Sequence, residues 1–297
     1  MNTHAEAFLK AATLTQALPW IRRFQDSIFV IKLGGNAMVD DELLQAFADD
    51  MVFLATVGVH PVVVHGGGPQ ISQALAERGI PSEFRGGYRV TSTEAIPIVR
   101  SVLREQISSD LAKRINSHGD ASSDLAVVLS GEDEELFSAA KRGAVVDGVD
   151  VDLGHVGDVV KVNPSGITRL ITQGKIPVVS SIAPNEAGGS LLNVNADSAA
   201  AALAIALGAQ KLVLLTDVGG LYANWPETDS LISSITLSEL DVLLPRLEHG
   251  MIPKMRACHD AVAAGVNKAA IIDGRIAHSI LLEAFTSEGI GTEVIAT

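Results

Sequence analysis

Two lysines and an aspartate occupy places in this chain where a charged side chain is costly unless it meets an opposite charge. Lys32 is the last residue but one of the apolar stretch IFVIKL, which leads directly into Gly34 and Gly35. Lys254 follows a proline in GMIPKM, so it falls in the first turn of a predicted helix, where the helix dipole opposes positive charge. Asp197 opens the alanine-rich run after NVNAD. An ammonium group in such places indicates a negatively charged ligand.

Glycine-rich turns follow three of the predicted strands. They read KLGGN after 28–33, HGGGP after 61–65 and DVGGL after 211–216. Backbone N–H groups can approach a ligand closely there, and the helix N-termini behind them add positive dipole ends. Because the C-terminal ends of parallel strands share one edge of a sheet, we expect a single anion site, most simply a phosphate site. The patterns GxxxxGK[ST] and GxGxxG are both absent, so this is neither of the two commonest nucleotide sites.

Polar residues suited to binding a small acid stand elsewhere in the chain. Arg89, in FRGGYRVT, follows a glycine turn and could hold a carboxylate with two hydrogen bonds, although a lone arginine there is more often a surface residue. Asn193, Asn195 and Asp197 alternate along an extended stretch, so all three can point the same way. The amides can bond a ligand, and the aspartate can orient lysine ammonium groups. We also expect Asp197 to serve in part as the N-cap of the next helix.

The elements that position these residues follow an alternating pattern. The predicted strands are 28–33, 61–65, 125–130, 176–182, 211–216 and 268–273. The predicted helices are 41–56, 70–78, 93–115, 164–174, 197–207, 236–246, 253–264 and 278–286. Most strands are solidly apolar, which predicts an α/β fold: a three-layer αβα sandwich with a central, mostly parallel open sheet. A helix over 6–24, kinked or broken at Pro19, precedes the sheet, and 130–160 reads as a hairpin-rich insertion.

Composition excludes several classes of function. The net charge of −13 argues against a general nucleic-acid or anionic-membrane binder. The longest apolar run, 199–207, is far short of the ~20 residues that cross a bilayer. A single cysteine, Cys258, permits no internal disulfide and fits a reducing compartment, so we expect a cytoplasmic protein. The eight histidines lack ligand spacing, so no protein metal site is expected. We expect Cys258 to pack in the core, His65 to bond within its turn and the acidic run 132–135 to be a solvated loop.

Taken together, six segments resemble the amino-acid kinase family. In order they are KLGGNAM, VVVHGGGPQIS, FRGGYRVT, NVNADSAA, KLVLLTDVGGLY and GMIPKM. The similarity covers nearly the whole chain, and the ordered set is highly specific although each motif alone is weak. GGYRVT and NVNAD favour the members that act on N-acetyl-L-glutamate over their relatives. The resemblance implies an N-terminal helical extension, 1–26, for oligomerisation and regulation. It also implies one amino-acid kinase domain, 27–297, with an acetylglutamate lobe of about 27–195 and an ATP lobe of about 196–297.

The resemblance also implies a role for each site residue. Charge on the transferring phosphoryl group would be stabilised by Lys32 and Lys254, which Asp197 would hold in place. Substrate-binding residues would be Gly67, Gly68, Arg89 and Asn193. Nucleotide-binding residues would be Gly34, Gly35, Asp217, Gly220, Tyr222 and Met251. The cofactor would be ATP with Mg²⁺, the metal being held mainly by the phosphates.

The implied reaction is the ATP-dependent phosphorylation of the γ-carboxylate of N-acetyl-L-glutamate to N-acetyl-L-glutamyl 5-phosphate, the second step of arginine synthesis. In arginine-inhibited members a similar N-terminal helix interlaces dimers into a hexamer, a trimer of dimers. The segment 271–295 resembles their arginine-binding region, which implies arginine as an inhibitor contacting Trp20, Glu283 and Gly289. That group usually has a histidine where this chain has Ala270. The departure bears on the strength of feedback rather than on kinase activity.

Two other readings stay open. The acceptor could be another small carboxylate or a carbamate, which GGYRVT and the twin asparagines argue against. The chain could instead be a catalytically silent arginine-binding regulator, which the joint retention of Lys32, Asp197 and Lys254 argues against. A dinucleotide oxidoreductase has least support, because no strand leads into GxGxxG.

Overall fold

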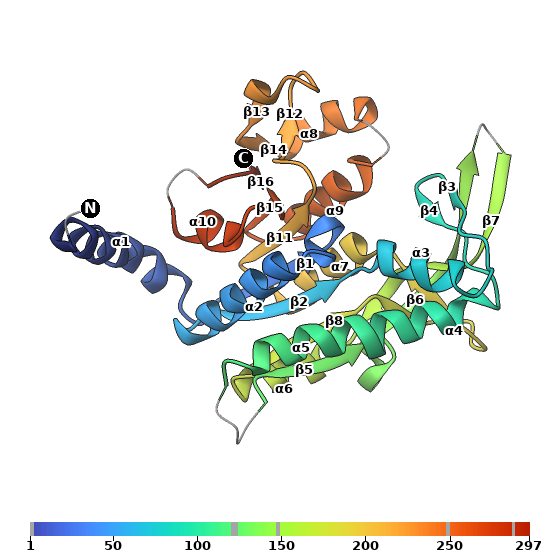
Figure 1. Ribbon diagram of the computed structural model, residues 1–297. Coiled ribbons are helices and arrows are strands. Elements are labelled where there is room, and N and C mark those ends of the chain that lie inside the picture. Colours follow the sequence, from blue (N-terminus) through green and yellow to red (C-terminus); the bar gives the residue numbers. More distant parts are fainter. Residues whose placement is uncertain (1–2, 120–123, 147–148, 248–249, 287–288) are drawn as a thin grey trace.

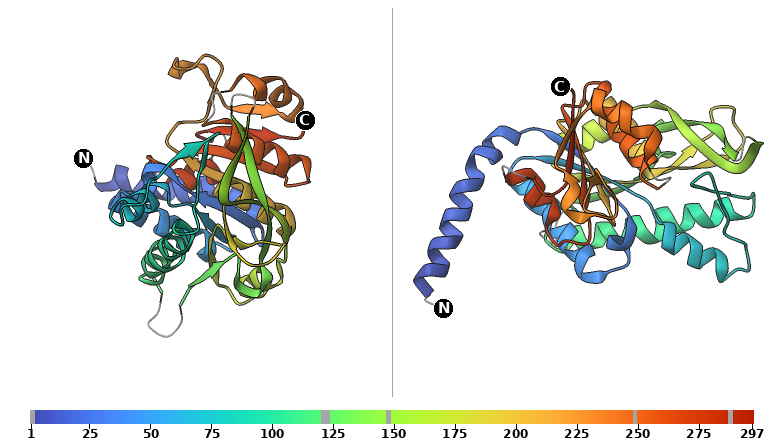
Figure 2. Two further views of the ribbon diagram at one scale, coloured as in Figure 1. Left: turned by 90° about the vertical axis from the view of Figure 1, so that its right-hand side faces the viewer. Right: turned by 90° about the horizontal axis from the view of Figure 1, so that it is seen from above.

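The computed structural model describes residues 3–119, 124–146, 149–247, 250–286 and 289–297 (Figure 1). An eight-stranded sheet forms its centre, in the order β14-β16-β15-β11-β1-β2-β8-β5. The strands from β15 to β5 are mutually parallel, whereas β16 is antiparallel to β15. Helices cover both faces (Figures 1 and 2), so the predicted three-layer α/β fold is confirmed.

All six predicted strands are present, and the sheet gains two more at one edge. The strands are β1 Ile28–Leu33, β2 His60–His65, β5 Ala126–Ser130, β8 Ile176–Ser180, β11 Lys211–Thr216, β14 Ser234–Thr236, β15 Lys268–Asp273 and β16 Thr292–Ile295. The α-helices are α1 Thr3–Phe24, α2 Asp41–Thr56, α3 Gly68–Ala76, α4 Ala95–Arg100, α5 Ser108–Asn116, α6 Ser165–Thr172, α7 Ala196–Leu207, α8 Leu237–Leu243, α9 Ile252–Ala263 and α10 Ser279–Phe285.

Alternation along β1 decides which way its lysine points. Phe29, Ile31 and Leu33 join the core that α2 and α5 cover. Val30 faces the opposite core, which α7 and α9 cover. Successive side chains of a strand point to opposite faces, so Lys32 points toward α7 and α9. The same core contains the fully buried Cys258, as predicted.

A second sheet confirms the predicted hairpin insertion. It consists of β6 Phe137–Val146, β7 Val149–Val162, β9 Ile182–Pro184 and β10 Leu191–Val194, in the order β6-β7-β10-β9. Two small hairpins complete the strands, β3 Phe84–Arg85 with β4 Tyr88–Arg89, and β12 Leu221–Tyr222 with β13 Leu231–Ile232. In Figure 1 the β3–β4 hairpin lies beside β7.

Three predictions about local structure are corrected. The helix predicted over 93–115 contains a π-helical turn, η2 (Ser101–Ile107), between α4 and α5. Helix α1 continues through Pro19, so the predicted break is wrong. The helix is exposed around that position, which lets water bond the carbonyl that the proline leaves free. The acidic run is a solvated loop only in part. Glu134 and Glu135 are exposed, but three of the carboxylates form ion pairs with arginines of helical segments, Glu132 with Arg100, Asp133 with Arg104, and Glu134 with Arg169.

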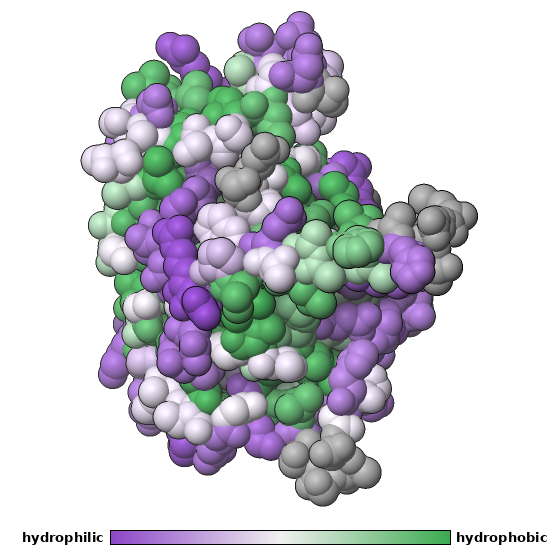
Figure 3. All heavy atoms as spheres, turned by 90° about the vertical axis from the view of Figure 1, so that its left-hand side faces the viewer, coloured by the Kyte–Doolittle hydropathy of each residue, from purple (hydrophilic) through white to green (hydrophobic). Residues whose placement is uncertain are grey.

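Helix α1 extends away from the rest of the molecule (Figures 1 and 2). It exposes large apolar side chains, namely Phe8, Leu9, Leu14 and Leu18. Figure 3 views the molecule from the side on which this helix emerges and shows hydrophobic surface interspersed with polar residues. Only its last turns join the core, where the ring of Phe24 packs 5.1 Å from that of Phe29 and 6.5 Å from that of Phe285. No helix among the described residues is long and apolar enough to span a membrane.

Candidate active site

One buried carboxylate connects the two lysines that the sequence singles out. The Oδ1 atom of Asp197, on α7, lies 2.8 Å from Nζ of Lys32 on β1. Its Oδ2 atom accepts a hydrogen bond from Nζ of Lys254, on α9, at 3.3 Å. Lys32 and Asp197 are buried, whereas Lys254 is partly exposed. The structure therefore brings together all three residues predicted to be catalytic.

The electrostatics of this cluster keep the carboxylate ionised. Burial alone would raise the pKa of Asp197, but the ammonium groups of Lys32 and Lys254 outweigh it and hold the pKa below its ordinary value. Two positive charges and one negative charge leave an excess of one positive charge at the junction of β1, α7 and α9. A site with this balance favours an anion beside the two lysines.

Local structure at the start of α7 explains how Asp197 is aimed. Asn195 is the N-cap of the helix, and its side chain accepts hydrogen bonds from the N–H groups of Asp197 and Ser198. The prediction that Asp197 itself caps the helix is therefore wrong. With the cap supplied by Asn195, Asp197 occupies the first turn, where its negative charge also suits the dipole. Asn195 is thus committed to the backbone, whereas the amide of Asn193 reaches Thr91 Oγ1 at 3.3 Å.

A cavity of about 170 Å³ is lined in part by Asn195 and Ala196, the two residues that directly precede Asp197. All four residues predicted to bind the substrate line it, namely Gly67, Gly68, Arg89 and Asn193. Arg89 is buried, and its Nη2 donates to the carbonyl of Gly68 and to Ser72 Oγ, both at 2.8 Å. A Cβ added at Gly68 would meet no atom within 4 Å, so its backbone borders open space. The lining also includes Asn195, and residues that the sequence prediction omitted, among them Tyr88, Leu103 and Ser181.

The glycine turn after β2 packs directly against the π-helical turn η2. A Cβ at Gly67 would lie 2.5 Å from Cδ1 of Ile107 and 2.9 Å from Cδ2 of Leu103, so a larger residue there would have to displace these side chains. His65, fully buried at the end of β2, bonds the carbonyl of Gly66 through Nδ1 at 2.9 Å, as expected within its turn. Its Nε2 lies 2.6 Å from the hydroxyl of Ser108, which follows η2. Burial lowers the pKa of His65 to about 4, so the ring is neutral near pH 7.

A second cavity, of about 290 Å³, reaches the cluster itself, because Lys254 is part of its wall. It is lined by three predicted nucleotide-binding residues, Gly220, Tyr222 and Met251, and also by Lys254. Trp225 lines it as well and lies 5.3 Å from the ring of Tyr222. Sequence reasoning overlooked Trp225, although its closeness to the glycine turn DVGGLY was a usable signal.

The other predicted nucleotide-binding residues, Gly34, Gly35 and Asp217, do not line this cavity. A Cβ at Gly34 would lie 2.9 Å from Cε of Lys32, so the lysine side chain passes directly over this glycine. Gly35 adopts a φ of +73°, and a Cβ there would lie 2.7 Å from Cγ of Asp217. The glycine pair therefore makes room for one lysine and one aspartate at the strand ends.

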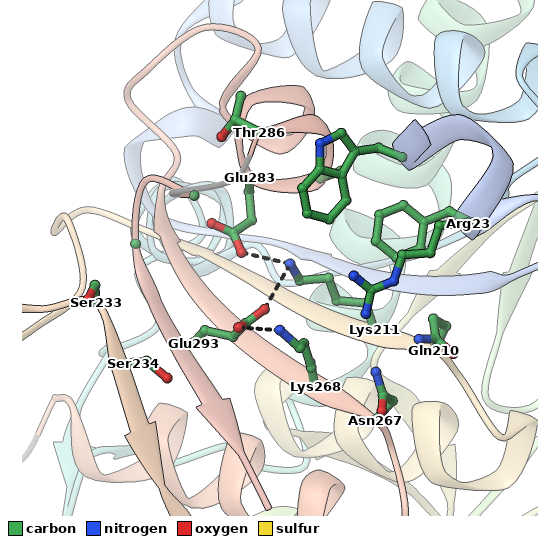
Figure 4. A pocket seen from close by; sticks show the side chains of 15 residues that line it. Arg23, Gln210, Lys211, Ser233, Ser234, Asn267, Lys268, Glu283, Thr286 and Glu293 are labelled. Carbon is green, nitrogen blue, oxygen red and sulfur yellow. Dashed lines mark hydrogen bonds and ion pairs between the residues drawn. The ribbon is translucent and has the colours of Figure 1, made fainter. Parts of the chain in front are cut away.

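A third cavity, of about 430 Å³, opens where α1 meets the sheet (Figure 4). The three residues predicted to contact an effector all line it, namely Trp20, Glu283 and Gly289. Figure 4 shows ion pairs crossing it, with Lys211 Nζ 2.7 Å from Glu283 and Lys268 Nζ 2.6 Å from Glu293. Lys211 also lies 3.4 Å from Glu293.

Within the described part of the chain, no group of three or more histidine, cysteine, aspartate or glutamate side chains is placed to hold a metal ion.

Comparison of the sequence with known proteins identifies the family to which the chain belongs. A model of the amino acid kinase family matches residues 27–273. The chain belongs to the amino acid kinase family. The acetylglutamate kinase of Leifsonia xyli subsp. xyli is 62% identical over 291 residues, 98% of this chain and 95% of that protein. The acetylglutamate kinase of an Arthrobacter species is 60% identical over 291 residues, 96% of this chain and 93% of that protein. Within the family, the chain groups with the acetylglutamate kinases.

Solved structures of this fold agree with the architecture. An N-acetylglutamate synthase from Neisseria gonorrhoeae, complexed with coenzyme A and N-acetyl-glutamate, superposes with a TM-score of 0.81 at 23% identity. The match covers 97% of this chain and 63% of the synthase. Carbamate kinase from Giardia lamblia bound to AMP-PNP superposes with a TM-score of 0.66 at 19% identity, over 92% of this chain and 99% of that one. At these identities the likeness establishes the fold alone.

Proposed function

We propose that this enzyme transfers the γ-phosphoryl group of ATP to the γ-carboxylate of N-acetyl-L-glutamate, forming N-acetyl-L-glutamyl 5-phosphate for arginine synthesis. The observation that carries the proposal is the Lys32–Asp197–Lys254 cluster, whose Lys254 lines a cavity with aromatic residues and whose Asp197 directly follows two residues, Asn195 and Ala196, that line a smaller cavity. The small cavity suits an amino-acid derivative, and the larger one suits a nucleotide. The high identity to acetylglutamate kinases supports the choice of acceptor.

The chemistry asks little of the protein beyond alignment and charge. A carboxylate is already a competent nucleophile, so no general base is required. Negative charge spreads over the phosphoryl oxygens as the transfer proceeds, and the two ammonium groups would stabilise it. Asp197 would fix both ammonium groups before the substrates arrive, which removes the cost of ordering them during the reaction.

The glycine turns would supply the remaining donors. Gly34 and Gly35 after β1, and Gly67 and Gly68 after β2, would direct backbone N–H groups at the phosphates and the transferring group. Arg89 and Asn193 would bind the acid and amide groups of the acceptor. ATP would enter with Mg²⁺, which neutralises phosphate charge and would be held mainly by the nucleotide. The acceptor would then belong to a lobe of about 27–195 and the nucleotide to a lobe of about 196–297.

The third cavity would bind arginine as a feedback inhibitor. The guanidinium group of the bound arginine would compete with Lys211 for the carboxylate of Glu283, beside the ring of Trp20. The apolar side chains exposed on α1 would pair with α1 of a neighbouring subunit and join dimers into a hexamer. Trp20 and Arg23 of α1 line the cavity, so an effector bound there would change the orientation of α1 relative to the rest of the molecule.

An assay of ADP release with Mg-ATP tests the proposal. The acceptors compared are N-acetyl-L-glutamate, glutamate and carbamate, each with and without arginine. We expect turnover with the acetylated acid alone and suppression of that turnover by arginine. Equal turnover with glutamate or carbamate would refute the choice of acceptor, and no turnover with any acceptor would refute the kinase proposal.

A further inference from the structure

The cavity of about 170 Å³, called the acceptor cavity because it is proposed to bind N-acetyl-L-glutamate, is lined in part by the β3–β4 hairpin. This hairpin is too short to be stable by itself. Strands β3 and β4 pair through only two residue pairs, Phe84 with Arg89 and Arg85 with Tyr88. The turn between them is Gly86–Gly87, with φ of 56° and 83°, as in the two-residue turns that favour hairpins. Isolated two-stranded hairpins are marginally stable at best, so contacts outside this one must fix its position.

Tyr88, on β4, receives a contact from outside the hairpin that can fix the hairpin's position. It is half-buried, and it lines both the acceptor cavity and a groove of about 440 Å³ behind the hairpin. Its ring therefore separates the two spaces. Tyr88 is also next in sequence to Arg89, so the position of the ring and that of the acceptor-binding guanidinium depend on the same two-residue strand.

Arg142, on β6, covers Tyr88 from the groove. Its guanidinium carbon lies 4.3 Å from the centre of the Tyr88 ring, a cation–π contact. Its Nη1 also donates to both carboxylate oxygens of Asp158 on β7, at 2.7 and 2.8 Å. The charge of Arg142 is thus held over the ring by a rigid partner on the neighbouring strand.

An irregularity in the β6–β7 ladder accounts for this placement. Lys141 pairs with Gly157, but Gly143 pairs with Asp152, so the register shifts at Arg142. Bulges bend a strand and redirect the side chain at the irregularity, and they recur beside active sites. The stretch of β7 that the ladder skips includes Gly154, which bridges to Thr91 just beyond β4.

We infer that Arg142 is a positioning residue for the acceptor site. By stacking on Tyr88 while paired with Asp158, it holds the β3–β4 hairpin, and with it Arg89, where the hairpin closes the acceptor cavity. The inference rests on the proposed function, because it assigns Arg142 to the cavity that would bind N-acetyl-L-glutamate. Arg142 does not line that cavity, so its effect on the acceptor passes through Tyr88.

Steady-state kinetics of Arg142→Ala test the inference. We expect the KM for N-acetyl-L-glutamate to rise by about tenfold, within the range that cation–π contacts span. The KM for ATP and kcat should stay within about twofold of wild type. Arg256→Ala is the matched control, because Arg256 lines the same groove with the same charge, and among the described residues the cation–π contact to Tyr88 comes from Arg142. An equal rise in KM for Arg256→Ala would assign the effect to charge alone and overturn the inference.

A double-mutant cycle distinguishes stacking from general destabilisation. In a Tyr88→Leu background, Arg142→Ala should raise the acceptor KM by less than about twofold further, because the contact is already lost. A full tenfold rise in that background, or an unchanged KM for Arg142→Ala alone, would overturn the inference. If wild type itself fails to phosphorylate N-acetyl-L-glutamate, the proposed function fails instead, and the two failures are thereby distinguished.

Discussion

Lys32 and Lys254 approach different oxygens of a single carboxylate, although they come from a central strand and from a helix more than two hundred positions later in the chain. Neither lysine needs a second acidic partner. Asp197 therefore fixes both ammonium groups at once and leaves one positive charge in excess, which suits the negative charge that spreads over a transferring phosphoryl group.

Removal of Lys32 should slow the chemical step. For Lys32→Ala we expect kcat to fall roughly 10²- to 10³-fold, the effect typical of losing one preorganised charge-stabilising donor. Initial rates at saturating ATP and N-acetyl-L-glutamate provide the measurement. Lys113→Ala, which removes an exposed lysine of α5, serves as control. A kcat for Lys32→Ala within about twofold of wild type would remove Lys32 from the mechanism.

Removal of Arg89 should act mainly on acceptor binding. Arg89→Ala deletes the guanidinium group that lines the acceptor cavity and leaves the lysine cluster intact. We expect the KM for N-acetyl-L-glutamate to rise at least tenfold with a smaller change in kcat, because a charge-assisted hydrogen bond is lost in ground and transition states alike. An unchanged KM would exclude Arg89 from the acceptor site.

Acid should destabilise the fold through His65. Burial lowers the pKa of His65 from 6.5 to about 4, so the unfolded chain binds a proton at a higher pH than the native protein does. The stabilisation is therefore complete above pH 6.5 and is lost as pH falls toward 4. Between pH 7 and pH 5 we expect wild type to lose about 2 kcal/mol more unfolding free energy than His65→Asn does, measured by urea denaturation.

Asp50 changes the stability of the fold with pH in the direction opposite to His65, so its charge should be removed before wild type and His65→Asn are compared. Burial raises the pKa of Asp50 to about 6, despite its hydrogen bond with His278, so stability from this group is lost as pH rises through 6. The two effects partly cancel in wild type. Both proteins should therefore carry Asp50→Asn. Equal pH dependence of the two proteins in that background would contradict the role given to His65.

Arginine should bind beside Trp20. The chain has two tryptophans, and Trp225 lies at the nucleotide cavity, so Trp225→Phe leaves Trp20 as the single indole reporter. Arginine should change its fluorescence saturably, and Glu283→Gln should weaken that binding at least tenfold because the carboxylate charge is lost. Lysine is the matched control ligand, because it keeps the charge without the guanidinium fork. No saturable change with arginine would exclude this cavity as the effector site.

Sequence reasoning reached the fold and the lysine cluster because each depends on a local signal. The apolar strands, the glycine turns and Lys254 after a helix-starting proline are all visible in short segments. Other features depend on contacts between distant segments. That Asn195 rather than Asp197 caps α7 is decided by Lys32 and Lys254, which draw the aspartate inward.

The same limit applies to the walls of the cavities. The stack of Arg142 on Tyr88 depends on a register shift between β6 and β7. No residue pattern in the sequence predicts this shift. The π-helical turn behind Gly67 is set by packing against the glycine turn after β2. The acidic run 132–135 forms ion pairs with arginines of other elements. Composition alone does not show these partners, so it suggested a solvated loop.

Asp197→Asn tests the central claim most directly, because it removes the bridging charge and nearly preserves the shape of the side chain. The measurement is kcat and both KM values under Mg-ATP and N-acetyl-L-glutamate, for a variant confirmed by circular dichroism to be folded. We predict that kcat falls roughly 10²-fold or more while both KM values stay within about threefold of wild type. A folded variant with a kcat within about twofold of wild type would contradict the claim that Asp197 organises the two lysines for phosphoryl transfer.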